Sequence, residues 1–131
     1  MESLPLIRSI LVADAGVTAK RTGNIHLNRV IPADPLPNVM LMAVGGDEGL
    51  AHDGPTGLLQ ERVRIWARGA TPQQAAELGT AIDRALHGYR GKVNGANVQL
   101  VQKVFALGDY DDAASVQQSI IDVRIHWGRA P

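Results

Sequence analysis

One stretch of the chain decides the fold: residues 53–91 read DGPTGLLQERVRIWARGATPQQAAELGTAIDRALHGYRG. Asp53–Leu58 is rich in turn residues, and the segment Glu61–Arg68 that follows alternates between apolar and polar residues. Thr71 then opens a helical pattern that ends at Gly88. This turn, strand, helix and stop contain no reactive centre, so the stretch predicts a unit that folds and assembles.

The alternation within the strand predicts a sheet with one buried face. Successive side chains of a strand point to opposite faces, so Val63, Ile65 and Ala67 share one face. The other face carries Arg62, Arg64, Trp66 and Arg68. The first set is expected in the core.

The helix after this strand has a well-marked start and one apolar stripe. Thr71 suits the N-cap, Pro72 the first helical position, and Gln74 a capping box. The stripe comprises Ala75, Leu78, Ile82, Ala85 and Leu86. A helix with this pattern is expected to pack one face against a sheet.

Working outward, the remaining elements are one helix and several strands. The segment 4–13 predicts a short amphipathic helix that stops before Gly16, and Ile25–Ile31 predicts an edge strand. Further strands are expected over 39–44, 98–107 and 116–127, with a turn-rich loop over 45–57.

These elements predict a single α+β domain over residues 1–131, with a mainly antiparallel four-stranded sheet and two helices packed on one face. The expected core residues are Val63, Ile65, Leu78, Ile82, Val123 and Ile125.

Composition excludes several functional classes. Thirteen basic residues balance thirteen acidic ones, which argues against sequence-independent binding of nucleic acid or of a membrane surface. The chain has no cysteine, so disulfides and thiolate chemistry are excluded. No apolar stretch approaches the length of a membrane span. No cofactor motif is present, and we expect neither a cofactor nor a metal.

The only cluster of carboxylates, histidine and glycines lies in the turn-rich loop. Asp47, Glu48, His52 and Asp53 are candidates for an acid–base set or for metal ligands. Their spacing matches no known ligand motif, and the glycines provide no rigid support. We therefore expect these four residues to contact a partner or solvent and not to catalyse.

Two helices can cover only one face of the sheet, which leaves the face with Arg62, Arg64, Trp66 and Arg68 open. An open face of this kind is either solvated or a subunit contact. Trp and Arg are enriched in protein interfaces. The sequence does not decide between the two.

The order of these motifs resembles the phage tail completion proteins, also called tail terminator or tail-to-head joining proteins. These proteins occur in long-tailed phages, prophages and gene transfer agents. The resemblance rests on an ordered set of segments that spans most of the chain. The set comprises the opening helix 4–13, the strand entry Leu36–Val39, the turn Asp53–Leu58, the helix Thr71–Leu86, the segment Leu86–Gly91, the turn Asp109–Asp111 and a last strand that ends near Trp127.

This resemblance implies a structural virion protein that forms a ring, commonly a hexamer, at the head-proximal end of the tail. The ring would stop polymerisation of the tube and join tail to head, so its partners would be itself, the major tail tube protein and a head connector or neck protein. Assembly would take place in the host bacterial cytoplasm. The family has no catalytic residues, and the segments Lys20–Pro37 and Gly45–Gly57 are expected to make contacts. A neck adaptor, or a small enzyme or metal-binding domain centred on His52, remains the alternative.

Overall fold

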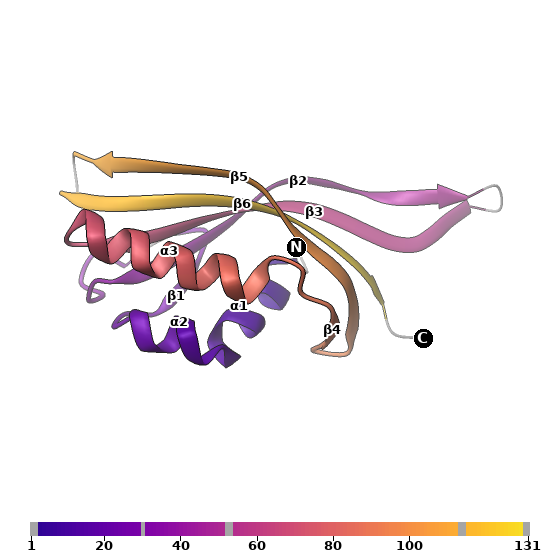
Figure 1. Ribbon diagram of the computed structural model, residues 1–131. Coiled ribbons are helices and arrows are strands. Elements are labelled where there is room, and N and C mark those ends of the chain that lie inside the picture. The colour runs from indigo at the N-terminus through magenta and orange to yellow at the C-terminus, as the bar shows by residue number, and fades with distance from the viewer. Residues whose placement is uncertain (1–2, 30, 52–53, 113–114, 130–131) are drawn as a thin grey trace.

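We analysed a computed structural model of the chain (Figure 1). It describes residues 3–29, 31–51, 54–112 and 115–129, with the backbone alone for 47–51, 54–58 and 129. The elements in chain order are α1 (Ser3–Ala13), α2 (Ala15–Lys20), β1 (Ile25–Leu27), β2 (Asn38–Ala51), β3 (Gly54–Gly69), α3 (Pro72–Leu86), β4 (Gly91–Val93), β5 (Ala96–Asp111) and β6 (Val116–Arg129).

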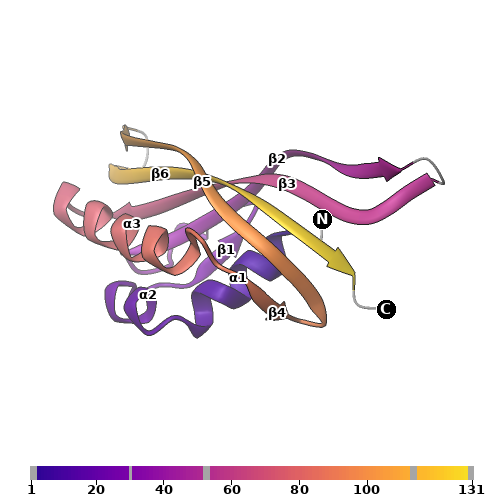
Figure 2. The same ribbon diagram turned by 45° about the vertical axis from the view of Figure 1, so that its right-hand side comes forward.

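The strands form a six-stranded mixed sheet in the order β1-β2-β3-β6-β5-β4. The β1 strand pairs with β2 in parallel, and the other neighbours are antiparallel. The sheet curls into a half-barrel over three helices (Figures 1 and 2). The prediction of a four-stranded antiparallel sheet with two helices is therefore wrong.

The missed elements are short or rich in glycine, so they lack a readable period. The β4 strand has three residues and α2 has six, whereas β1 is the start of the edge strand predicted over Ile25–Ile31. Asp14 was read as part of a stop, but it is the N-cap of α2, where its carboxylate accepts a hydrogen bond from the Val17 N–H at 2.9 Å. Residues 45–51 and 54–57 of the supposed loop belong to the strands of the long β2–β3 hairpin, which extends beyond the helical layer (Figure 1).

The core lies between the helices and the concave face of the sheet. All three helices lie on this side (Figure 2). The six residues expected in the core are all buried there: Val63, Ile65, Leu78, Ile82, Val123 and Ile125. None of the described helices is long and apolar enough to cross a membrane.

Helix α3 lies close against β6 at Gly79. A Cβ atom added there would lie 2.5 Å from Ser119 Oγ and 3.0 Å from Ser119 Cβ on β6. Glycine at this position costs helix stability but allows the helix to sit close to the strand. The pair therefore sets the height of α3 above the sheet.

We expect Gly79→Ala to destabilise the protein by about 1–2 kcal/mol, because overpacking outweighs the gain in helix propensity. Urea unfolding of the single and double variants measures the effect. Ser119→Gly should restore much of the loss in the double variant, since it removes the atoms with which the new methyl group collides. A Gly79→Ala variant more stable than wild type would contradict this packing.

A candidate assembly interface on the outer face of the sheet

The outer face of the sheet, opposite the helices, carries the residues that the strand alternation assigned to it. Arg62, Arg64, Trp66 and Arg68 project from β3 on this side, because Val63, Ile65 and Ala67 between them are buried under the helices. Cross-strand pairing extends the face over the neighbouring strands. In the part of the chain that the structure describes, no helix covers it (Figure 2).

One carboxylate organises the arginines of this face. Asp122 of β6 lies directly opposite Arg64 and is fully buried. Arg64 donates to it through two nitrogens, at 2.8 and 3.0 Å, and Arg62 Nε donates at 2.8 Å. Two-pronged pairs of this kind fix side-chain geometry as well as charge. Two guanidinium groups against one carboxylate leave a net positive charge on the outer face.

The environment of Asp122 lowers its pKa. Burial alone raises the pKa of a carboxyl group, but the hydrogen bonds from Arg64 and Arg62 and the charges of both outweigh it. The pKa of Arg64 is raised by the same hydrogen bond and charge. The cluster is therefore most stable when Asp122 is ionised.

This lowered pKa predicts how stability depends on acid. A depressed carboxyl pKa stabilises the fold fully above the unfolded value of about 4, and the contribution is lost as pH falls through the lower folded value. Asp122→Asn should cost about 1–3 kcal/mol at pH 7. The gap in unfolding free energy between wild type and the variant should narrow below about pH 4. Denaturant unfolding between pH 7 and 3 measures it, and a gap that stays constant would contradict the role of Asp122.

An apolar strip crosses the outer face next to this cluster. Pairing aligns one residue from each of four strands: Met40, Trp66, Ile120 and Leu107. Leu107 is 52% exposed, and Phe105, beside Asp122, is 42% exposed. Aromatic, methionine and arginine side chains together are typical of the core of a protein interface. The strip therefore has the chemistry of a contact surface.

Arg68 lies on the outer face of β3, whereas Glu61 lies on its helix side. Arg68 donates to Asn38 Oδ1 at 3.5 Å, so it is tied to the start of β2. Glu61 projects to the helix side, where the Ser3 hydroxyl group donates to it, and burial raises the pKa of its carboxyl group. The bond to Ser3 directs Glu61 away from the arginines of the outer face.

The side chains of the acidic cluster lie outside the part of the chain that the structure describes. Asp47 and Glu48 lie in β2 near the tip of its hairpin, where only the backbone is described. His52 and Asp53 lie outside the described residues. Among the described side chains, no group of three or more His, Asp or Glu residues could hold a metal ion. The assignment of these four residues to a contact remains a prediction.

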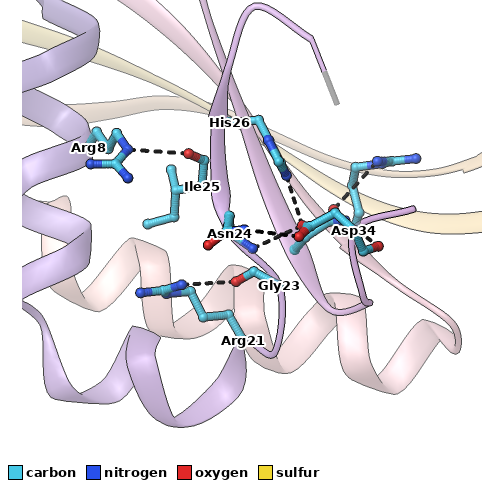
Figure 3. A network of polar contacts seen from close by, with 9 residues as sticks. Arg8, Arg21, Gly23, Asn24, Ile25, His26 and Asp34 are labelled. Atoms are coloured by element: carbon cyan, nitrogen blue, oxygen red, sulfur yellow. Dashed lines mark hydrogen bonds and ion pairs between the residues drawn. The ribbon is translucent and has the colours of Figure 1, made fainter. Parts of the chain in front are cut away.

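A second polar cluster holds the loop between β1 and β2 (Figure 3). The Asp34 carboxylate accepts from the backbone N–H of Asn24 at 2.9 Å and from its side-chain amide at 3.1 Å. His26 Nε2 lies 2.8 Å from the same carboxylate. Burial raises the pKa of Asp34, but the bonds from His26 and Asn24 outweigh it, so the net shift is downward. These bonds connect two parts of Lys20–Pro37, the segment expected to make contacts: the loop at Asp34 and the strand β1.

Sequence reasoning identified neither the central role of Asp122 nor the part of Phe105 and Leu107 in this face. Both apolar residues were assigned to a strand without a face. The bulge between Lys103 and Phe105 interrupts the alternation of this strand, so no sequence period assigned the two residues to a face.

Comparison with known proteins identifies the family. The profile of the tail completion protein gp17 family matches residues 5–127. The chain belongs to this family. It is therefore a structural protein of the phage tail. The predicted family and the predicted location in the virion tail are confirmed.

A solved structure supports the fold assignment of this tail completion protein. A chain in the virion of a native gene transfer agent particle superposes with a TM-score of 0.66 at 16% identity. The match covers 94% of this chain and 92% of that chain. At this identity the likeness shows a shared fold. The search of curated proteins gave no match.

Proposed function

We propose that the protein forms a homo-oligomeric ring, six subunits being the expected number, that caps the head-proximal end of the tail tube. The ring ends polymerisation of the tube and presents a surface to the head connector or neck protein. Family membership supplies the setting in the tail. The function needs neither a cofactor nor catalysis.

The observation that carries the proposal is the uncovered outer face. Its apolar strip and its arginines lie on the side of the sheet away from all three helices (Figure 2). A ring also needs a heterologous contact, in which two different patches of one subunit meet on neighbours. A sheet with different surfaces on its two faces and two different edges supplies such patches.

A neck adaptor is the second candidate, because an adaptor would use the same kind of surface to join tail and head. The two functions differ in what they do to the tube. An adaptor joins tails that have already ended, whereas a terminator also ends them.

Deletion of the gene should leave heads and tails unjoined. Electron microscopy of lysates should show separate filled heads and free tails, and a plasmid copy of the gene should restore complete particles. Complete, infectious particles from the deletion strain would contradict both candidates.

A further inference from the structure

The outer edge of β5 is hydrogen-bonded to other segments over only part of its length. The short strand β4 pairs with Ala96–Val98. Next, the segment Gly88–Tyr89 exchanges two backbone hydrogen bonds with Val101, at 2.8 and 3.1 Å. His87 Nδ1 then accepts from the Lys103 N–H at 3.1 Å. Beyond Lys103, no strand in the described parts of the chain pairs with this edge.

The unpaired segment of this edge, Phe105–Tyr110, has the properties of a strand that pairs with another strand. It pairs with β6 on its inner side without a register shift. Phe105, Leu107 and Tyr110 are 42%, 52% and 44% exposed. The segment contains no proline, lysine or arginine, the residues that usually protect an edge from pairing. An exposed, regular, apolar edge of this kind is a template for another strand.

The opposite side of the sheet also has an open edge. The β1 strand pairs with Val39–Leu41 of β2, and the Asn28 N–H donates to Leu41 O at 2.8 Å. The edge of β1 is itself held, since Arg8 donates to Ile25 O at 3.3 Å (Figure 3). From Met42 onward, no described strand pairs with the outer edge of β2.

We propose that these two open edges pair with each other between subunits: Phe105–Tyr110 of one subunit adds to the segment 42–47 of the next. The inference rests on the proposed ring and names its contact. Three antiparallel steps separate β2 from β5, so β5 runs opposite to β2. Copies placed side by side in one orientation therefore bring these edges together as an antiparallel pair. The contact is heterologous and repeats until the ring closes.

The geometry of this pairing suits a closed ring. Phe105 lies level with Met42 across the sheet, so pairing Leu107 with the partner subunit's Val44 shifts the subunits by about four residues, roughly 14 Å. Four strands span roughly 19 Å, and the resulting strand tilt of about 35° lies within the range of closed β-barrels.

The side chains in this register are complementary. Leu107 lies opposite the partner subunit's Val44, which is 41% exposed, so each covers an apolar side chain of the other. Asp109 then lies opposite the partner subunit's Met42, beside the partner's Arg64 on the outer face. The acidic end of β5 thus meets the basic face of the neighbour.

Cysteine cross-linking tests the contact directly, because the chain contains no cysteine of its own. We would make Leu107→Cys and Val44→Cys separately, mix them under mild oxidation, and analyse the product without reductant. The mixture should give a covalent dimer, and neither variant alone should. The double variant should give a ladder that ends in a closed species, whose number of rungs is the ring size. If the isolated double variant assembles too weakly to cross-link, the same cross-links should form in phage particles that contain it.

The matched control pairs Leu107→Cys with Val12→Cys, since Val12 is 40% exposed on α1 and lies away from both edges. To allow for a different register, cysteines at 105, 107 and 109 are scanned against cysteines at 42, 44 and 46. A dimer from Leu107→Cys alone would show two-fold pairing of β5 edges and overturn the proposal. So would the absence of any edge-to-edge cross-link, both in concentrated protein and in particles.

The proposed function and the proposed strand pairing are rejected by different results. Rings seen by electron microscopy without edge cross-links would reject only the strand pairing. Edge cross-links in a protein whose deletion leaves tails normal would reject only the terminator function.

Discussion

Replacement of Ile82 by alanine should lower the free energy of unfolding by about 2–5 kcal/mol. Ile82 is fully buried and lies on the stripe of α3 that packs on β3 and β6. The substitution removes three buried carbons and leaves a cavity, because a helix held by neighbouring contacts cannot close the gap. Denaturant unfolding followed by circular dichroism measures the change.

The matched control is Ala76→Gly on the exposed side of the same helix. It should cost about 1 kcal/mol from helix propensity alone. A loss below about 0.5 kcal/mol for Ile82→Ala would mean that α3 is not the helix that closes the core.

Trp66→Ala should abolish ring assembly while the subunit stays folded. Trp66 stands in the middle of the apolar strip, and central tryptophans contribute at least about 2 kcal/mol to many interfaces, which is roughly 30-fold in affinity per contact. A ring repeats the loss at every contact. Light scattering and sedimentation of the isolated protein, and incorporation into tails, measure it.

Val12→Ala is the control for Trp66→Ala, because it removes an exposed apolar side chain from the helix side. It should leave assembly unchanged. Arg64 is a poorer test residue, since its loss removes the main partner of the buried Asp122. Rings of normal size and affinity from Trp66→Ala would mean that the outer face is solvated.

The sequence allowed the parts of the fold with a strong period or a clear cap to be predicted. Val63, Ile65 and Ala67 alternate with polar residues, and all three are buried as expected. The N-cap of α3 was also predicted, and the structure confirms it: the Thr71 hydroxyl group accepts a hydrogen bond from the Gln74 N–H at 3.1 Å.

The sequence did not allow the size of the sheet to be predicted. A strand of three residues, such as β4, has too few side chains to show alternation and exists because a neighbouring strand offers it hydrogen bonds. The bulge at Gly45, where φ is 141°, interrupts the alternation of β2, so a continuous strand was read as a loop. Pairing with distant strands, which no local sequence pattern encodes, determines the presence of the short strand and the length of β2.

The candidate interface was predictable in its composition but not in its organisation. The alternation put Arg62, Arg64, Trp66 and Arg68 on one face, and the structure places them there. The position of Asp122 opposite Arg64 depends on the register between β3 and β6, which are separated by α3 and two further strands in the chain. The open edges depend on where short strands end, which the sequence does not reveal.

The length distribution of tails made without this protein tests the central claim most directly, because it separates a terminator from an adaptor. Electron microscopy of a deletion strain, beside the same strain with the gene restored, gives the distribution. A terminator predicts tails longer than wild type and broadly spread in length, since nothing stops addition of tube subunits. Unjoined tails of a single, normal length would contradict the terminator function.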